Sequence, residues 1–335
     1  MIQRRLLYPF ILLAVTYALG SESSRIDDLK RAFARPDSIP APKDNQLTES
    51  RVSLGKALFF EPRISGSGIL SCASCHNPSL DWEDGLPRSV GHQHKMLDRS
   101  TPTLLNVAWN SSNFWDGRAD TLEDQALAPI ESSTEMNADI EVTLQTLGAL
   151  PQYVGAFETA YPGEGITKQT VAKAISSFER TIVSGTAPFD RWIEGDESAI
   201  SDSAKNGFLL FNTKAACVKC HSGWNFTNGS FHDIGVISDD LGRGGVLGIE
   251  SMNHTFKTPT LRNVARRAPY THNGSEATLR NVIELYNQGG RIKRATLSSE
   301  IKTLGLSQDE VDDLIAFLDT LTSDDHAPEL PKLPR

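Results

Sequence analysis

Two copies of the pattern Cys-x-x-Cys-His decide the fold of this 335-residue chain: Cys72-Ala73-Ser74-Cys75-His76 and Cys217-Val218-Lys219-Cys220-His221. The two runs contain all four cysteines of the sequence. At this spacing the two thiols can each form a thioether to one porphyrin, and the adjacent histidine supplies an imidazole to the iron. The sequence therefore predicts two covalently bound haem c groups, with His76 and His221 as their proximal ligands.

Paired cysteines also occur in zinc sites, redox-active disulfides and structural disulfides. A zinc ribbon needs its two pairs close together in sequence, whereas Cys75 and Cys217 are separated by a large part of this chain. A thioredoxin-like motif needs no histidine after the second cysteine, and it belongs to a βαβ pattern that this sequence lacks. Haem attachment is therefore the favoured interpretation.

The N-terminal segment 1–20 is typical of a cleaved secretory signal. Arg4 and Arg5 precede an apolar run that ends at Ala18-Leu19-Gly20, before a polar stretch. The run is shorter than the roughly 20 uninterrupted apolar residues of a membrane-spanning helix, and we expect no membrane span in the mature chain. Because c-type haem is attached outside the cytoplasm, these features predict a periplasmic protein.

The net charge of the sequence is −9, and it becomes −11 when the two arginines of the signal are removed. A strongly acidic chain is a poor match for nucleic acid, so nucleic-acid binding is disfavoured. An acidic surface can steer a basic small redox protein, although net charge alone identifies no partner.

Helical periodicity predicts an all-α fold with two cytochrome c-like haem domains. Apolar residues recur with a helical period over residues 49–60, 170–182 and 307–321, and alternating strand-like stretches are scarce. At this length the chain can form two compact domains. We expect a signal over 1–20, an extended proline-containing lead-in over 21–48, an N-terminal haem domain over 49–190 and a C-terminal haem domain over 191–335.

An internal repeat indicates that the two domains are related by duplication. Residues 101–129 align without gaps with residues 258–286, and 10 of the 29 positions are identical. The last aligned pair is Pro129 and Tyr286. A phenol oxygen can bind ferric iron, whereas a proline side chain has no donor atom. Tyr286 is therefore either a ligand that closes the second haem while the first stays open, or an ordinary packed tyrosine.

Several longer motifs extend this pattern: Arg99-x-Thr101-Pro102-Thr103, Phe114-Trp115-Asp116-Gly117-Arg118-Ala119, Leu122-Glu123-x-Gln125-Ala126, Glu135-Met136, Pro259-Thr260-Leu261-Arg262-Asn263-Val264 and Ala268-Pro269-Tyr270-x-His272-x-Gly274. Together they resemble the bacterial di-haem cytochrome c peroxidase and MauG superfamily over nearly the whole mature chain. The resemblance implies that the N-terminal haem reacts with hydrogen peroxide and that the C-terminal haem relays electrons.

The same resemblance assigns roles to individual side chains. It implies that Glu135 is the catalytic acid/base, that Gln125 is its distal partner and that Trp115 is the indole between the haems. Taken alone, Glu135 is more often a solvated acid and Trp115 more often core packing. Tyr286 falls where the peroxidases carry a methionine ligand and where MauG carries tyrosine, while Met252 is a competing ligand candidate.

At two positions, His92 and Ala215, this sequence departs from the MauG subgroup of the family. Gly91-His92 matches the loop histidine that caps the resting peroxidatic haem in bacterial cytochrome c peroxidases and that MauG lacks, although nearby His94 leaves this assignment ambiguous and His92 is alternatively a solvated loop residue. Ala215 stands where MauG offers an aromatic residue for electron transfer from its protein substrate.

The family often holds calcium between its domains. Ser100 and Arg267 stand here at positions where asparagine and threonine are expected, and Pro269 is retained. A cation beside Arg267 would experience charge repulsion, so bound calcium is doubtful.

The sequence thus favours a di-haem c-type cytochrome peroxidase that reduces hydrogen peroxide to water, with electrons from a small cytochrome c or a cupredoxin. One alternative is MauG-like peroxide-dependent oxidation of a partner protein, as in cofactor maturation. Another is a non-enzymatic di-haem electron carrier with both irons six-coordinate.

Overall fold

Helices dominate the computed structural model, which describes residues 26–325 and 327–334. The α-helices are α2 (Glu49–Phe59), α3 (Cys72–Cys75), α4 (Leu122–Glu131), α5 (Ile140–Gly148), α6 (Pro151–Ala160), α7 (Lys168–Glu179), α8 (Pro188–Ile193), α9 (Asp202–Asn212), α10 (Gly242–Leu247), α11 (Leu279–Asn287) and α12 (Gln308–Asp319). Short 3-10 turns are η1 (Pro62–Ile64), η2 (Pro78–Leu80), η3 (His92–His94), η4 (Val107–Trp109), η5 (Cys217–Lys219), η6 (Glu250–Met252) and η7 (Val264–Arg266). Within the described part of the chain, the strands are β1 (Phe231–His232) and β2 (Phe256–Lys257), which pair antiparallel. The fold is therefore mostly helical.

The three helices predicted from periodicity are present as α2, α7 and α12. Each begins at a hydroxyl side chain that accepts hydrogen bonds from backbone N–H groups of the first turn: Thr48, Thr167 and Ser307. Thr167 and Ser307 belong to reciprocal capping boxes with Thr170 and Glu310. Local sequence thus fixes where these helices start.

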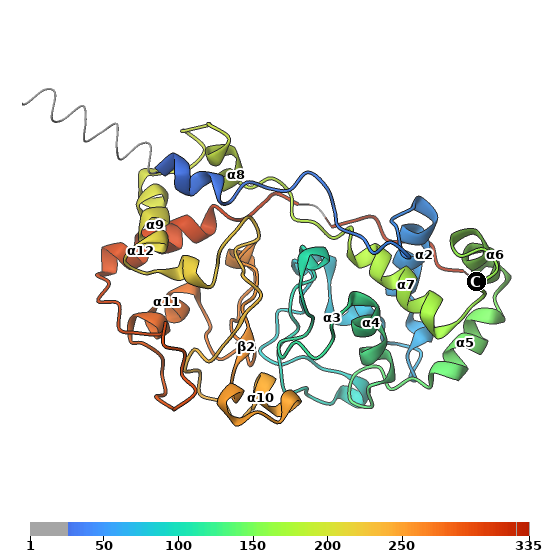
Figure 1. Cartoon of the computed structure of the whole chain (residues 1–335). Coiled ribbons are helices and arrows are strands. Elements are labelled where there is room, and N and C mark those ends of the chain that lie inside the picture. The colour runs from blue at the N-terminus through green and yellow to red at the C-terminus, as the bar shows by residue number, and fades with distance from the viewer. Residues whose placement is uncertain (1–25, 326, 335) are drawn as a thin grey trace, which may run out of the picture.

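Two hydrophobic cores divide the molecule into two cytochrome c-like halves, which lie beside one another in Figure 1. The first core contains buried residues from Leu54 to Ile182 and surrounds α2, α4 and α7. The second contains buried residues from Phe189 to Leu321, together with Phe33, and surrounds α8, α9 and α12.

One pair of crossing helices organises each half. A Cβ atom on Gly55 of α2 would lie 1.8 Å from the carbonyl oxygen of Ala174 in α7, and a Cβ atom on Gly207 of α9 would lie 2.0 Å from that of Asp313 in α12. Only glycine permits backbones to approach this closely. Each helix pair therefore crosses at a glycine.

Two asparagines occupy matching places in the halves. Asn106 and Asn263 both have left-handed backbone conformations, with φ of 62° and 57°. Their backbone N–H groups donate to the carbonyl oxygens of Ile182 (2.8 Å) and Leu321 (3.0 Å). Their side-chain oxygens each accept a hydrogen bond from a serine N–H, of Ser184 and Ser323, at 3.0 Å.

Both ends of the described chain cross from one half to the other. Residues 26–31 are helical, and Phe33 is 1% exposed in the second core, where it stacks on Phe226. Asn45, further along the same segment, is buried against α7 of the first half. At the other end, Pro334 accepts a hydrogen bond of 2.8 Å from Arg63. The expected signal over residues 1–20 lies outside the described residues, and no helix within them has the length and apolar character of a bilayer span.

Candidate haem centres

A cavity of about 1370 Å³ is lined by residues of both halves, including both Cys-x-x-Cys-His motifs. This volume exceeds the ~300–1,000 Å³ of an ordinary small-molecule site, so the cavity has room for more than one large group. Trp115, Gln125, Pro129, Glu135 and Tyr286 also line it. The structure therefore brings most of the predicted site residues to one continuous space.

The first motif presents a neutral imidazole. α3 closes the loop between Cys72 and Cys75, and the N–H of His76 donates to the Cys72 carbonyl oxygen at 2.9 Å. Nδ1 of His76 lies 3.1 Å from the carbonyl oxygen of Trp82. Because a carbonyl only accepts, Nδ1 carries the proton and Nε2 keeps a lone pair for iron. Burial lowers the pKa of His76, which also favours the neutral ring.

The second motif repeats this arrangement. The N–H of His221 donates to the Cys217 carbonyl oxygen at 2.8 Å, and Nδ1 of His221 donates to the Phe226 carbonyl oxygen at 2.9 Å. Burial lowers the pKa of His221 to about 4. Both imidazoles are thus oriented by a backbone carbonyl a short way downstream in the chain.

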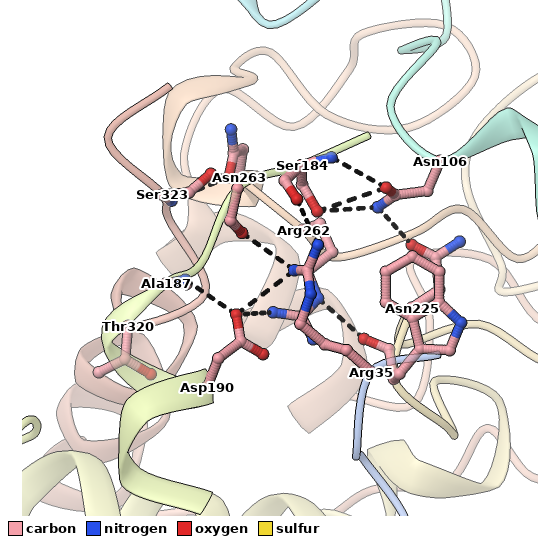
Figure 2. Close-up of polar contacts among 12 residues, drawn as sticks. Arg35, Asn106, Ser184, Ala187, Asp190, Asn225, Arg262, Asn263, Thr320 and Ser323 are labelled. Carbon is pink, nitrogen blue, oxygen red and sulfur yellow. Dashed lines mark hydrogen bonds and ion pairs between the residues drawn. The ribbon is translucent and has the colours of Figure 1, made fainter. Parts of the chain in front are cut away.

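Polar contacts hold the loop that follows the second motif, as Figure 2 shows. Arg262 donates through Nε to the carbonyl oxygen of Trp224 at 2.8 Å, and its Nη1 lies 2.8 Å from the Asp190 carboxylate. Asn106 of the first half donates to the side-chain oxygen of Asn225 at 2.9 Å. Since Phe226 follows directly, these contacts also position the carbonyl that orients His221.

The donor set fits covalent haem. All four thiols are free, both histidines have Nε2 available, and the cavity wall includes many apolar side chains from both halves. Burial raises the pKa of Cys75 to about 11 and that of Cys217 to about 12, so these thiols are protonated before attachment. Cys72, Cys75 and His76 would hold one haem, and Cys217, Cys220 and His221 would hold the other.

Glu135 and Gln125 lie on the side of the first motif. Negative charge on Glu135 contributes to the raised pKa of Cys75, which places this carboxyl near the first cysteine pair. Burial raises the pKa of Glu135, and the nearby Arg118 charge and a hydrogen bond from Ser132 oppose that rise. Oε1 of Gln125 is buried and has no hydrogen-bond partner in the described part of the chain. The Gln125 carbonyl is therefore available to a molecule that enters the cavity, and Glu135 lines the same wall.

Trp115 is held by both halves. Its indole Nε1 donates to the carbonyl oxygen of Ser100 at 2.9 Å, and its own carbonyl accepts from the N–H of Lys257 in β2 at 2.8 Å. The side chain lines the common cavity.

Tyr286 lies on the side of the second motif. It projects from α11 into the cavity. Burial raises the pKa of Tyr286 above its usual range, and charge on Cys217 and Cys220 adds to the effect. Among the described residues its hydroxyl makes no hydrogen bond. Pro129, its partner in the sequence repeat, also lines the cavity but offers no donor atom.

His92 and Met252 do not belong to the cavity wall. Nε2 of His92 lies 3.2 Å from Nδ2 of Asn137, and the N–H of His92 donates to the Glu135 carbonyl oxygen at 2.8 Å. Met252 ends η6, where its carbonyl accepts a hydrogen bond from Thr255 at 2.7 Å. The geometry favours Tyr286 over Met252 as a ligand candidate.

The structure also adds residues that the sequence interpretation missed. Glu179 lines the cavity from α7, and Lys257 reaches it from β2, where burial lowers the lysine pKa to about 8. His272 stacks on Phe256 with ring centroids 3.7 Å apart. A signal existed for Glu179, because it lies one helical turn after Ile175 on the apolar face of its helix.

The position expected for calcium is marked by an ion pair. Arg267 Nη1 lies 3.1 Å from a carboxylate oxygen of Glu83, and Nη2 donates to the Thr260 carbonyl oxygen at 2.6 Å. Residues 26–325 and 327–334 contain no group of three or more His, Cys, Asp or Glu side chains arranged to hold a metal ion.

Comparisons with known proteins agree with this geometry. Residues 49–198 match the family model for di-haem cytochrome c peroxidase, and residues 204–322 match that for cytochrome c. The chain is 48% identical to the methylamine utilization protein MauG of Methylorubrum extorquens, over 96% of this chain and 92% of that protein. It is 37% identical to cytochrome c551 peroxidase of Nitrosomonas europaea, over 90% of this chain and 87% of that protein.

A solved structure shares the fold. It is that of a MauG-like protein associated with microbial copper homeostasis, with a TM-score of 0.80 and 30% identity, covering 87% of this chain and 95% of that one. Sequence, cavity and relatives converge on one chemistry: two covalently bound haem c groups in an enzyme that acts on peroxide. This chain belongs to the di-haem cytochrome c peroxidase and MauG family.

Proposed function

We propose that this protein couples peroxide reduction to the oxidation of a partner protein, as a MauG-type enzyme, and that Tyr286 ligates the second iron. The observation that carries the proposal is the Tyr286 hydroxyl, which lies in the cavity beside the second cysteine pair without a hydrogen-bond partner among the described residues. Reduction of peroxide to water remains one half of the reaction. What distinguishes this proposal is the source of the electrons.

A phenolate ligand favours an enzyme that oxidises an electron donor of high reduction potential. An anionic oxygen stabilises ferric and more oxidised iron relative to ferrous iron, so it lowers the reduction potential. A haem of this kind is a poor acceptor for electrons from an ordinary small redox protein. The higher identity to MauG (48%) than to cytochrome c551 peroxidase (37%) supports the same choice.

The two haems, when bound, supply irons that exchange electrons with peroxide and with each other. Glu135 takes a proton from the attacking oxygen of hydrogen peroxide and returns it to the departing oxygen. The amide of Gln125 orients that molecule beside Glu135. Trp115 stands between the halves as the aromatic side chain through which electrons pass. Overall, one peroxide takes up two electrons and two protons and leaves as two waters.

A cytochrome c peroxidase that accepts electrons from a small cytochrome c or cupredoxin is the second candidate. The Gly91-His92 pair in the sequence favours it, because a loop histidine could cap the first haem in the resting enzyme. In the structure His92 instead pairs with Asn137, outside the cavity wall.

Three further proposals follow from the architecture and the sequence. The haem domains span 49–190 and 191–335 and arose by duplication, which the matched glycine crossings and the matched asparagines Asn106 and Asn263 support. The signal-like segment 1–20 exports the chain to the periplasm. The ion pair between Arg267 and Glu83 takes the place of calcium between the halves.

The test is the reaction of the purified ferric holoprotein with hydrogen peroxide, followed by optical and EPR spectroscopy. We expect one high-spin and one low-spin ferric haem, reaction without prior reduction, and loss of the low-spin signal in Tyr286→Phe. The matched control is Tyr270→Phe, which removes a hydroxyl bonded to the Val264 carbonyl at 2.9 Å and should keep the low-spin signal. A ferric protein that stays inert until half-reduced supports the second candidate. Two low-spin haems in both states would identify an electron carrier.

A further inference from the structure

Glu179 is a buried acid whose carboxyl has no hydrogen-bond partner among the described residues. It is 4% exposed, and its Oε2 is the buried atom left without a hydrogen bond there. The neighbouring Arg180 directs both Nη atoms to Glu123 instead, at 2.8 and 2.9 Å. A buried carboxyl without a hydrogen bond or counter-ion is costly, so its presence calls for an explanation in function.

The second half shows what the fold itself requires at this position. Ser184 and Ser323 donate to the matched asparagines, so these two serines correspond to each other. At the glycine crossings, a Cβ atom on Gly55 would touch Phe178 and one on Gly207 would touch Phe317, so these two phenylalanines correspond to each other. Phe317 follows Phe178 by the same number of residues as Ser323 follows Ser184. Glu179, which follows Phe178, therefore corresponds to Leu318.

Both of these side chains line the cavity, but Leu318 is apolar. Packing at the matching position is satisfied by leucine in the same fold, so the carboxyl is not needed for the helix crossing. The substitution of an acid for an apolar residue is specific to the first half.

The carboxyl lies beside the first attachment site. Negative charge on Glu179 contributes to the raised pKa of Cys72. The groups whose charge acts on Glu179 are Arg180 on its own helix and Glu123 on α4, which pair with each other. Once Cys72 carries a thioether it no longer titrates, and α2, which packs against α7, contributes no charge that acts on Glu179. The first haem is then the main charge that this carboxyl senses.

We propose that Glu179 is a proton-exchanging group coupled to the first haem. Glu179 releases its proton when that haem loses an electron and takes it back when the electron returns. Each step then changes the positive charge at this buried site by less than the electron alone would, because one proton leaves with each electron. The carboxylate thereby stabilises the oxidised states that peroxide produces.

The direction of the pKa agrees with this role. Burial raises the pKa of Glu179 to about 8, with Arg180 opposing the rise. The acid is therefore protonated at neutral pH until nearby positive charge increases, and positive charge lowers the pKa of a carboxyl. The inference rests on haem bound at Cys72, Cys75 and His76, and it is independent of Tyr286 and of the identity of the electron donor.

The test is spectroelectrochemical titration of each haem in wild-type holoprotein as a function of pH. The reduction potential of the first haem should fall as pH rises toward about 8 and level off above it, because oxidation of the haem lowers the carboxyl pKa and the slope lies between the two values. The second haem has Leu318 at this place and serves as the internal control: its slope reports the other titrating groups of the cavity, such as Lys257 with a pKa of about 8, and the slope of the first haem should exceed it. A first haem whose slope is no larger than that of the second overturns the proposal with no variant needed.

Two variants then assign the slope to Glu179. Glu179→Gln keeps the shape without the titration, and Glu179→Leu installs the residue of the second half. In both, the first haem should lose its excess pH slope over the second and have a higher potential at alkaline pH, while Tyr286→Phe should leave the excess slope in place. An excess slope that survives in Glu179→Gln assigns the proton to another group and refutes the proposal. Failure of the MauG-type reaction leaves this result unaffected, because the titration needs neither peroxide nor a partner protein.

Discussion

Arg262 and Asp190 form an ion pair of 2.8 Å in which neither side chain has exposed surface. The guanidinium also holds the Trp224 carbonyl and lies over the ring of Phe226, 5.2 Å from its centroid. Burial lowers the pKa of Arg262 to about 10, which still leaves it charged at neutral pH. A buried charge pair of this kind thus anchors the loop whose carbonyl orients His221.

Arg262→Met should destabilise the holoprotein by about 3–5 kcal/mol, because it leaves the buried Asp190 carboxylate with the Ala187 N–H at 2.8 Å and with Arg35, at 3.5 Å, as its nearest counter-charge. The control is Arg280→Met, which removes an exposed pair with Asp312 and should cost less than about 1 kcal/mol. Denaturant unfolding followed by circular dichroism measures both. Equal losses in the two variants would show that burial does not govern the Arg262 pair.

Gly207→Ala should be strongly destabilising, since its Cβ would lie 2.0 Å from the Asp313 carbonyl oxygen and force α9 away from α12. Gly155→Ala is the matched control: it lies inside α6, and no atom of the described residues lies within 4 Å of the added Cβ, so it should stabilise by roughly 0.5–1 kcal/mol. Thermal unfolding of both holoproteins gives the comparison. We expect the unfolding temperature to fall in Gly207→Ala and to rise in Gly155→Ala. A similar small change in both would mean that α9 and α12 pack less closely than the structure shows.

Local sequence signals predicted the parts of this molecule that depend on neighbours in the chain. The two haem motifs are each a single short run of sequence, and α2, α7 and α12 carry both periodicity and hydroxyl caps. The repeat placed Pro129 against Tyr286, and both line the cavity. In such cases spacing along the chain fixes position in space.

The remaining features depend on contacts between distant segments. Phe33 lies in a charged, proline-containing stretch that gave no sign of joining the second core. Tyr286 and Met252 were both ligand candidates by type, and only the fold separates one that faces the cavity from one that does not. Glu179 carried a local signal, yet its lack of a partner follows from Arg180 turning to Glu123 on another helix.

His92→Ala should leave the rate of reaction between ferric holoprotein and peroxide within about twofold of the wild type. Such a change is small, because even a tenfold change in rate corresponds to only ~1.36 kcal/mol of activation free energy. The reason is that Nε2 of His92 faces Asn137 and its backbone is bound to the Thr134 and Glu135 carbonyls. Stopped-flow absorbance with and without prior half-reduction is the measurement. A large increase in the rate for the ferric variant would instead reveal His92 as a cap that leaves on reduction.

Glu135→Gln should slow the peroxide reaction by ~10²–10⁴-fold, because the amide cannot accept the proton of the attacking oxygen. The pH dependence has a definite sign. Burial raises the pKa of Glu135 above 4.5, and the base must be ionised to act. The rate in the wild type should therefore rise with pH through a value above that of an ordinary glutamate.

The same raised pKa makes the stability of the fold decrease as pH rises, whereas the reaction rate increases. The reason is that the native state binds the proton more tightly than the unfolded chain does. The stability contributed by protonated Glu135 is complete below pH 4.5 and is lost as pH rises through the native value. Glu135→Gln should thus lose the acid limb of the rate profile and unfold less readily than the wild type at neutral pH. Glu131→Gln, an exposed acid paired with Lys168 at 2.8 Å, should change neither profile. If Glu135→Gln lost both activity and stability, Glu135 would have a structural role. A catalytic role predicts lower activity together with higher stability at neutral pH.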